Sequence, residues 1–504
     1  MTLRDILNRL DDAVASGNLD TEVTGIAYDS RKVTKGTIFV ALRGTSSDGH
    51  DFIEKAIAQG AAAIVAEIAP PHYSKTVWIH VRSTRLALAE ISETFYDDPS
   101  HSLLVGAVTG TNGKTTTAFL LHHLLNHAQR RCGLLGTVVY DVGGELKPAT
   151  HTTPESLELQ ALLADMRTHG CRAVAMEVSS HALDQKRIHG VKIDAAIFTN
   201  FTQDHLDYHG TMDKYFEAKA KLFAQASKVN GAKLIINIDD TGGRRLASAF
   251  SEHPGLVTYG LGATADFRAV NPRYELTGTT FEFEHKGRSL LVRIPLIGQF
   301  NVYNTLAALA AAHGMGCNLR DSVRAMQSAP QVPGRMERVT ERERFHVFVD
   351  YAHTPDGLVN ALASARGLRP GRIITVFGCG GDRDRAKRPL MAKAAEEGSD
   401  VCILTSDNPR TEDPARIFED ARRGFSRTSN TVIADRKEAI QTAIENAREG
   451  DLILIAGKGH ETYQDIEGVK HPFDDRRVAR QLLDQMTRQI GEKRLQQMQW
   501  EDRR

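Results

Sequence analysis

Residues 110–116, GTNGKTT, have the residue types and spacing of a loop that binds phosphate. Glycines let backbone N–H groups wrap around phosphate oxygens, Lys114 neutralises charge, and the Thr115 hydroxyl can serve a magnesium ion. The common pattern has a glycine where this chain has Val108, so the loop is a shortened variant. An apolar stretch precedes it, and a helical stretch follows and directs its positive end at the anion. We predict phosphate binding here rather than a simple glycine turn.

Residue types that bind metals follow two other apolar stretches. Glu177 lies at the end of AVAMEV, and the segment TNFTQDHLDYHG, residues 199–210, contains two aspartates and two histidines, among them His205. A carboxylate at the end of a strand can reach a nucleotide-bound Mg²⁺. A solvated strand end and an ordinary turn explain the same residues, and for each histidine taken singly the turn is the simpler interpretation.

The segment TSDNPRTEDP, residues 405–414, presents a carboxylate, an amide, a proline and a guanidinium directly after an apolar run. A surface turn accounts for Asp407, Asn408 and Pro409. Pro409 fixes its own φ and biases Asn408 toward an extended conformation, so that Arg410 can offer paired hydrogen bonds to a carboxylate. We predict a carboxylate-binding site at Arg410, with an incidental surface arginine as the alternative.

These segments lie where α/β folds place ligand-binding loops. Strands are predicted at residues 24–33, 36–44, 61–67, 103–110, 173–178, 195–200, 233–238, 347–350, 372–378, 401–405, 431–435 and 452–457. Most precede a polar or glycine-rich loop and then a helix, which is typical of a parallel sheet. Ligands bind beyond the carboxyl ends of such strands, and the loops DYAHTPD, GCGGDRDRAKRP, SDNPRTED and GKGHE fall there.

The length of 504 residues exceeds what one core can organise and predicts about three domains. Two proline-containing breaks, YDDPSHS at residues 96–102 and APQVPG at residues 329–334, divide the chain. We therefore predict an α/β fold of three domains, residues 1–98, 99–333 and 334–504, with a parallel sheet around the phosphate loop.

The composition excludes several classes of protein. Lys plus Arg equals Asp plus Glu at 63 each, and a net charge of zero does not favour binding to nucleic acid or to an anionic membrane. The five cysteines form no CxxC pair, which suits a reducing cytosol. The chain shows no signal-peptide core and no apolar stretch that could span a bilayer. We expect a soluble, cytoplasmic, monomeric protein.

Taken together, the motifs resemble those of the Mur ligases over nearly the whole chain. They are GTNGKTT, MEVSSHALDQKR, FTNFTQDHLDYHG, EAKAKLF, GQFNVYN, DYAHTPD, GGDRDRAKRPLM, DNPRTE and GKGHE, in the order and spacing of that family. The phosphate loop is common to all Mur ligases and to folylpolyglutamate synthases, whereas DNPR resembles the members that add meso-diaminopimelate. The resemblance implies a first domain for the uridine nucleotide, a central ATPase domain, and a Rossmann-like third domain that receives the amino acid.

The resemblance also implies roles for individual residues. The expected ATP contacts are Gly110, Thr111, Asn112, Gly113, Lys114, Thr115, Thr116, Asn301, Arg335, Asp350 and His353. Those for a UDP-N-acetylmuramoyl (UDP-MurNAc) peptide are Ser30, His151, Thr152, Thr153, Ser179, Gln185 and Arg187, with the loop Thr45, Ser46 and Ser47 facing uracil. Those for diaminopimelate are Arg383, Asp407, Asn408, Pro409, Arg410, Gly457 and Glu461. Thr115, Glu177 and His205 are expected to bind Mg²⁺, and Lys219 to carry a carbamate.

The implied reaction is the ATP-dependent addition of meso-diaminopimelate to UDP-MurNAc-L-Ala-D-Glu through an acyl phosphate, in peptidoglycan precursor synthesis. Phosphoryl transfer depends on positioning and charge neutralisation, which accounts for Lys114, the Mg²⁺ groups and the arginines. A lysine-adding Mur ligase and a folylpolyglutamate-type ligase share this chemistry, and DNPR argues against both. A P-loop switch or motor that makes no bond is the alternative from another class, and it would not need the loops of the third domain.

Overall fold

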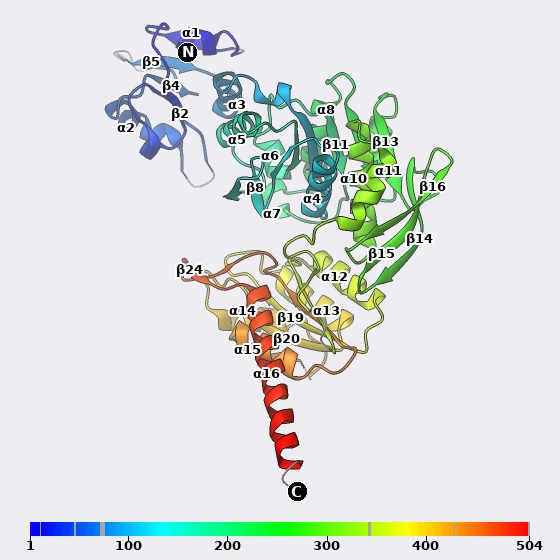
Figure 1. Cartoon of the computed structure of the whole chain (residues 1–504). Helices are drawn as coiled ribbons and strands as arrows, with labels where there is room; N and C mark the ends of the chain where they lie inside the picture. The colour runs from blue at the N-terminus through cyan, green and yellow to red at the C-terminus, as the bar shows by residue number, and fades with distance from the viewer. Residues whose placement is uncertain (11, 45–46, 71–75, 341–343, 429, 502–504) are drawn as a thin grey trace.

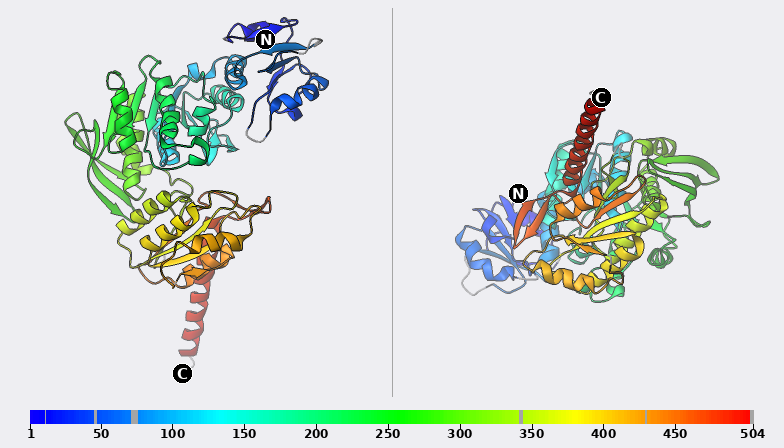
Figure 2. Two further views of the ribbon diagram at one scale, coloured as in Figure 1. Left: turned by 180° about the vertical axis from the view of Figure 1, so that it is seen from behind. Right: turned by 90° about the horizontal axis from the view of Figure 1, so that it is seen from below.

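The computed structural model describes residues 1–10, 12–44, 47–70, 76–340, 344–428 and 430–501. The predicted uracil-facing residues Thr45 and Ser46 lie outside these ranges. Figures 1 and 2 show three α/β domains that follow one another along the chain, each with its own sheet. The predicted fold class is confirmed.

The first domain contains a mostly parallel sheet in the order β1-β5-β4-β3-β2. Its strands are β1 Val14–Ser16, β2 Gly25–Ala27, β3 Thr37–Val40, β4 Ala63–Ala66 and β5 Val77–His80. Its helices are α1 Leu3–Leu7, η1 Ser30–Lys32, η2 Gly49–Phe52, α2 Ile53–Ala58 and α3 Thr84–Phe95. Every residue of β3 and β4 is buried, since apolar side chains on both faces of these strands enter two separate clusters.

The central domain is built on a sheet in the order β16-β15-β14-β13-β12-β11-β6-β10-β7-β8-β9. Its strands are β6 Leu104–Thr109, β7 Cys132–Leu135, β8 Val139–Asp141, β9 Leu146–Pro148, β10 Ala173–Glu177, β11 Ala195–Phe198, β12 Lys233–Asn237, β13 Leu256–Gly260, β14 Phe267–Glu275, β15 Gly278–His285 and β16 Arg288–Ile294. The strands from β14 to β7 are parallel, and antiparallel strands extend both ends of the sheet. The predicted parallel sheet therefore forms the middle of a larger one.

The helices of the central domain cover both faces of this sheet. They are η3 Pro99–Ser102, α4 Lys114–His127, α5 Ser156–Thr168, α6 Ser180–Asp184, α7 Leu206–His209, α8 Met212–Ala226, α9 Thr241–Ala249, α10 Gln299–Gly314, α11 Leu319–Ala325 and η4 Met326–Ser328. α10 is apolar around almost its whole circumference and packs against α4, which fixes the helix that follows the phosphate loop.

The third domain contains a sheet in the order β17-β18-β22-β19-β20-β21, parallel except for β17. Its strands are β17 Glu337–Arg338, β18 His346–Asp350, β19 Ile373–Cys379, β20 Val401–Ser406, β21 Thr431–Val432 and β22 Leu452–Ala456, with a hairpin of β23 Tyr463–Ile466 and β24 Val469–Pro472. Its helices are α12 Pro355–Gly367, α13 Lys387–Gly398, α14 Pro414–Arg422, α15 Arg436–Glu445 and α16 Asp475–Glu501, the last of which runs away from the domain in Figure 1.

The two breaks seen in the sequence separate the sheets. Asp97 and Asp98 have left-handed φ angles of 59° and 45° between α3 and η3, and the second break precedes β17. The boundaries at residues 98 and 333 stay predictions. Within the described ranges, no helix is both long and apolar enough to cross a membrane.

Candidate active site

The phosphate loop connects β6 to α4. Gly110 and Gly113 have φ angles of 148° and 85°, and a Cβ atom at either position would collide with the side chain of Thr199 or Asn304. Only glycine fits both positions, so the loop backbone stays open at the start of the helix. This confirms the strand–loop–helix context on which the prediction of phosphate binding depends.

Two lysines converge on this loop. Lys114 Nζ donates to the carbonyl oxygens of Gly110 (3.0 Å) and Thr111 (2.8 Å), and Lys219 Nζ, from α8, donates to Gly110 O (2.7 Å). Burial lowers the pKa of both lysines, and for Lys219 the charge of Lys114 lowers the pKa further. The sequence did not indicate that these two lysines lie close together, because they are on different helices, α4 and α8.

Glu177 lies at the end of β10 with its carboxylate beside the phosphate loop. Oε2 accepts from Thr115 Oγ1 (2.9 Å), and Oε1 accepts from the backbone N–H of Thr137 (2.8 Å). A buried carboxylate and a hydroxyl offer the hard oxygen ligands that Mg²⁺ prefers, so this pair fits the metal.

His205 belongs to a different group of side chains. Its ring centroid lies 4.8 Å from that of His181, and its Nε2 lies 3.4 Å from Asp204 Oδ2. Burial lowers the pKa of His205 to about 4. Among the described residues, no three His, Cys, Asp or Glu side chains are placed to hold a metal ion together. The assignment of His205 as a ligand stays a prediction.

The predicted residues for the muramoyl peptide form a continuous chain of contacts. Thr152 Oγ1 lies 3.1 Å from Thr137 Oγ1, and Thr153 Oγ1 donates to Glu177 O (3.0 Å) and accepts from the N–H of Ser179 (3.0 Å). Arg187 Nη1 donates to Thr153 O (3.0 Å), and Nη2 donates to Gln185 Oε1 (2.7 Å). These contacts bring three segments of the central domain together next to Glu177.

Two residues predicted for the same ligand lie apart from this chain of contacts. Ser30 is buried at the start of η1 in the first domain, near Tyr28, whose hydroxyl donates to Glu158 Oε1 of α5 (2.9 Å). The side chain of His151 is exposed and lies 3.3 Å from Thr150 Oγ1. Both assignments stay predictions.

Two residues that follow the second break in the chain contact the phosphate loop. Arg335 Nη2 donates to Thr115 Oγ1 (3.0 Å), and its guanidinium lies 4.8 Å from the centroid of Tyr351. Asn112 Nδ2 donates to Asp356 Oδ2 at the start of α12 (3.0 Å). Residues from two domains therefore surround the place where the phosphates are expected.

The remaining predicted ATP residues line the same junction. Asp350 is partly buried, and the loss of solvation raises its pKa; its carboxylate accepts from the N–H groups of Met336 and Ala352. The ring of His353 lies 4.6 Å from that of Tyr351. On α10, Asn301 is buried and its Oδ1 accepts from Asn304 Nδ2 (3.0 Å).

In the third domain, the loops that follow β19, β20 and β22 meet at one edge of the sheet. Asn408 O accepts from the N–H of Gly381 (2.9 Å), and Arg410 Nη1 donates to Gly381 O (2.5 Å). Asn408 Nδ2 donates to Glu461 Oε2 (2.9 Å). A Cβ atom at Gly457 would lie 2.6 Å from Asp407 Oδ2, so glycine is needed for this close approach.

Arg410 is held in a strained backbone conformation. Its φ is 53°, and its N–H and C=O bond to Asp465 and Glu467 of the β23–β24 hairpin (2.9 and 2.6 Å). Arg383, by contrast, is exposed, and among the described residues its guanidinium donates a hydrogen bond only to the neighbouring Asp382 O (3.3 Å). The structure thus brings Asp407, Asn408, Arg410 and Glu461 together and leaves Arg383 at the rim.

Three family models match the chain in the order of its domains. The Mur ligase family catalytic domain matches residues 22–96, the Mur ligase middle domain residues 108–312, and the glutamate ligase domain of Mur ligases residues 334–459. A curated relative from Solibacter usitatus is 46% identical over 96% of this chain and 98% of its own length. The chain belongs to the Mur ligase family. Mur ligases are ATP-dependent, ADP-forming amide ligases that use a divalent cation, so the predicted family and enzyme class are confirmed.

Other Mur ligases and a folylpolyglutamate synthase show how far the similarity extends. The relatives from Solibacter usitatus and from Geobacillus kaustophilus, the latter 46% identical over 92% of this chain and 95% of its own, are both UDP-N-acetylmuramoyl-L-alanyl-D-glutamate–2,6-diaminopimelate ligases. A solved structure of a ligase with that name is 37% identical, with a TM-score of 0.69 over 97% of this chain and 99% of its own. The folylpolyglutamate synthase of Mycobacterium tuberculosis, 18% identical with a TM-score of 0.60 over 74% and 92% of the two chains, shares the fold.

Sequence reasoning missed several residues of this Mur ligase site. Asn304 and Asp356 contact the phosphate loop, and Lys387 Nζ lies 3.1 Å from Asp204 Oδ1 across the domain junction. Lys458 lies between two predicted diaminopimelate residues. All four residues belong to motifs already identified, so the motifs could have indicated them: Asn304 in GQFNVYN, Asp356 in DYAHTPD, Lys387 in GGDRDRAKRPLM and Lys458 in GKGHE.

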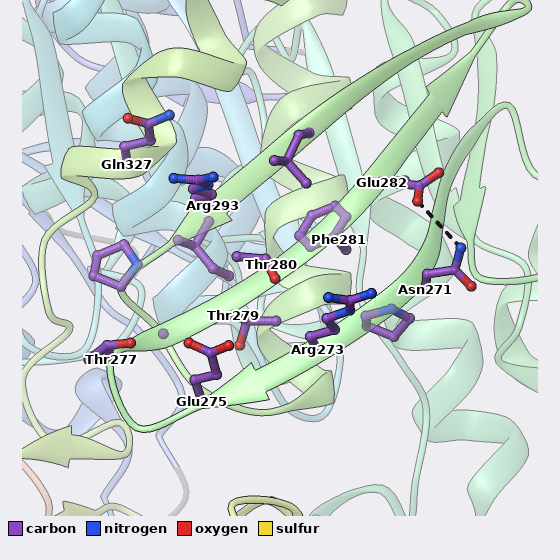
Figure 3. Close-up of a pocket in the computed structure, with 15 residues that line it drawn as sticks. Asn271, Arg273, Glu275, Thr277, Thr279, Thr280, Phe281, Glu282, Arg293 and Gln327 are labelled. Atoms are coloured by element: carbon purple, nitrogen blue, oxygen red, sulfur yellow. Dashed lines mark hydrogen bonds between the residues drawn. The ribbon is translucent and has the colours of Figure 1, made fainter.

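A groove of about 920 Å³ lies elsewhere on the central domain (Figure 3). The antiparallel strands β14, β15 and β16 line it together with Gln327, and Arg273, Thr280 and Arg293 are neighbours across the strands. Glu275 and Glu282 also line the groove, and Glu282 Oε1 accepts from Asn271 Nδ2 (3.4 Å). None of the predicted site residues lines this groove, so it is separate from the candidate active site.

Proposed function

We propose that this Mur ligase joins meso-diaminopimelate to UDP-MurNAc-L-Ala-D-Glu, using ATP and Mg²⁺ and releasing ADP and phosphate. Residues 1–98 would bind the uridine nucleotide, residues 99–333 would bind ATP, and residues 334–504 would receive the amino acid. The proposal includes a monomer, because the predicted residues for all three substrates are on one chain. Size-exclusion chromatography with light scattering tests that part, and a dimer mass would contradict it.

The observation that carries the proposal is that a guanidinium and a carboxylate, Arg410 and Glu461, both lie at the edge of the third sheet. Arg410 donates to a backbone carbonyl and, among the described residues, forms no ion pair with a carboxylate. Glu461 lies across the same loops, joined to Asn408. The far end of meso-diaminopimelate carries a carboxylate and an ammonium, which complement a guanidinium and a carboxylate.

The central domain supplies the groups that activation of the substrate carboxylate requires. A carboxylate resists attack by an amine, and transfer of the γ-phosphoryl group of ATP converts it to an acyl phosphate with phosphate as leaving group. Lys114 and the loop N–H groups would neutralise and orient the phosphates. Thr115 and Glu177 would hold Mg²⁺, with His205 as a further predicted ligand, and the metal would supply additional charge neutralisation.

Lys219 is proposed to carry a carbamate. Its buried ammonium lies beside Lys114, and two cations close together in a low dielectric repel each other. A carbamate would replace this cation with an anion able to serve the metal. Crystals grown with bicarbonate test this: density that ends at an unmodified ammonium would contradict the proposal.

An assay with three amino acids tests the main proposal. ADP release is measured with UDP-MurNAc-L-Ala-D-Glu and meso-diaminopimelate, L-lysine or D,D-diaminopimelate, and the product is identified by mass. We expect turnover to require the nucleotide peptide and meso-diaminopimelate. Lysine would leave Arg410 without an anionic partner, and such a loss can reach roughly 10⁴-fold in discrimination. Equal use of lysine would contradict the proposal.

The variants Arg410→Ala and Arg410→Lys test the residue itself. Loss of the two-pronged contact is expected to lower kcat/KM for meso-diaminopimelate by roughly 100-fold or more, with the KM for ATP unchanged. Arg416→Lys, an exposed arginine on the neighbouring α14, is the matched control and should behave as wild type. Unchanged kinetics in either Arg410 variant would refute the assignment.

A further inference from the structure

Lys458 is an ammonium group enclosed in the third domain. The residue follows Gly457 at the end of β22 and is 0% exposed. Its Nζ donates to Asn408 Oδ1 (2.9 Å) and to Glu461 Oε2 (3.0 Å). A buried charge is costly unless it is paired and hydrogen-bonded, so these two contacts explain how the ammonium is retained.

The two partners of Lys458 are residues that the proposed function assigns to diaminopimelate, whereas Lys458 itself has no assigned role. The contacts close a triangle, since Asn408 Nδ2 also donates to Glu461 Oε2 (2.9 Å). The three residues come from two loops about fifty positions apart in the sequence. An ammonium between them therefore sets the distance between the DNPR loop and the GKGHE turn.

Lys458 and the backbone of Asp465 together determine which way the Asn408 amide points. Asn408 Oδ1 accepts from Lys458 Nζ and from the backbone N–H of Asp465 (3.0 Å). Both neighbours are donors only, so an inverted amide would place its own NH₂ group against two N–H groups. The carbonyl oxygen is committed to these donors, and one N–H of the amino group is used by Glu461, so the second N–H of Asn408 is the part left to face a ligand.

The same contacts leave Asn408 as a hydrogen-bond donor and Glu461 as an acceptor for a ligand. Oε2 of Glu461 accepts from both Lys458 and Asn408, whereas Oε1 has no hydrogen-bond partner among the described residues. A fixed amino group can donate to a carboxylate, and a free carboxylate oxygen can accept from an ammonium. The far end of a diamino diacid needs one of each.

We propose that Lys458 is a positioning and specificity-determining residue. It orients the Asn408 amino group toward the distal carboxylate of the amino-acid substrate, and it holds Glu461 so that Oε1 receives the distal ammonium. The inference rests on the proposed function, because it concerns the substrate of that site. A lysine that served only to fold the domain would leave the apparent affinity for this one substrate unchanged.

The chain offers a matched control for removing this lysine. Lys470, on β24, lies 4.3 Å from the ring centroid of Tyr463, and Lys458 lies 5.6 Å from the same ring. Lys470 is exposed and makes no hydrogen bond to Asn408 or Glu461 among the described residues. Lys470→Met therefore removes an ammonium from the same neighbourhood and leaves the triangle intact.

The test compares steady-state kinetics of the full-length wild type, Lys458→Met and Lys470→Met. For Lys458→Met we expect the KM for meso-diaminopimelate to rise by about 10- to 100-fold, the range of a lost charged hydrogen bond, with kcat within threefold. The KM values for ATP and for the nucleotide peptide should stay within twofold. Lys470→Met should match wild type in every constant.

A second variant keeps the test decisive if methionine prevents folding. Lys458→Gln retains an N–H donor group without the charge. Its KM for meso-diaminopimelate should lie between that of the wild type and that of the methionine variant. If the methionine variant does not fold, the KM of Lys458→Gln should still lie clearly above that of the wild type. A KM within twofold of wild type in the folded variant, or a parallel rise for all three substrates, would overturn the inference and leave the proposed function standing. A wild-type chain that does not consume meso-diaminopimelate would overturn both.

Discussion

Replacing Arg388 with methionine should destabilise the third domain, because this arginine forms hydrogen bonds to two loops of the candidate site. Its side chain is 2% exposed, and its Nη atoms donate to Glu412 (2.9 and 2.6 Å) and to Asp420 (3.0 Å). Nη2 also donates to Gly380 O (3.3 Å). The DNPR loop continues into Glu412, and Gly380 begins the loop that carries Arg383, so Arg388 joins both.

The expected loss of stability depends on the partners that Glu412 keeps after the substitution. Breaking a buried ion pair on one side costs about 3–5 kcal/mol, because the other charge stays buried without compensation. Glu412 would keep the exposed Arg385 (2.9 Å) and the N–H of Asp382 (3.1 Å), which places the loss near the lower end, at about 3 kcal/mol. For a domain of this size, 1 kcal/mol shifts Tm by about 2–4 °C, so a fall of about 6–12 °C is expected.

Differential scanning calorimetry at pH 7 measures this fall, with Arg423→Met as control. Arg423 Nη1 lies 3.2 Å from the same Asp420, but its side chain is 66% exposed. An exposed pair contributes at most about 1 kcal/mol, so the control should lose no more than about 4 °C. Equal shifts for the two variants would refute the argument that burial determines the contribution of Arg388.

The pH dependence provides an independent check of the same contact. The hydrogen bond from Arg388 holds the pKa of Glu412 down to about 2, below its ordinary 4.5. A lowered carboxyl pKa contributes stability that is present above the ordinary value and is lost as the pH falls through the lowered one. The gap in Tm between wild type and Arg388→Met should therefore narrow between about pH 4.5 and pH 2. A constant gap over that range would contradict this linkage.

Two further predictions concern other parts of the molecule. Burial raises the pKa of Glu93 to about 7 from 4.5. The contribution of the protonated Glu93 carboxyl to the free energy of unfolding is therefore complete below pH 4.5 and is lost as the pH rises through 7. Denaturant unfolding should show that Glu93→Gln is more stable than wild type at pH 8, by about 1 kcal/mol after allowance for solvent screening. At pH 4 the two proteins should be equally stable. Equal stability at both pH values would contradict this prediction. Gly457→Ala should raise the KM for meso-diaminopimelate at least about tenfold, because the added Cβ would displace Asp407. Gly468→Ala is the control, since Gly468 also has a positive φ but has open space where the Cβ would lie. This variant should lose stability without a change in KM. Equal KM values for the two alanine variants would show that the contact with Asp407 is unimportant.

Much of the fold could be predicted from local patterns. The apolar runs at residues 173–178, 233–238 and 401–405 are buried strands, and the predicted phosphate loop lies between a strand and a helix. The predicted strand over residues 24–33, however, ends at Ala27, because the Asp29 side chain caps a short 3₁₀ turn that begins at Ser30. Local hydrogen bonding of this kind competes with strand pairing and does not change the apolar pattern.

The antiparallel strands at the far edge of the central sheet were not predicted. β14 alternates buried and exposed residues only partly and contains Pro272 and a register shift after Val270. A bulge of this kind interrupts the period of two on which a strand prediction depends. The pairing with β13 and β15, rather than the sequence of β14, determines that this segment is a strand.

The sequence by itself determined which chemical groups this Mur ligase carries and at which ends of which strands they lie, because side-chain alternation and glycine-rich loops are local properties. It did not determine how those groups meet. Arg410 adopts its left-handed conformation because a hairpin more than fifty residues later bonds both sides of its backbone. Lys458 and Asn408, and likewise Lys114 and Lys219, come together only when separate strands and helices pack. Contacts between distant segments depend on the packing of whole domains, and no short stretch of sequence contains that information.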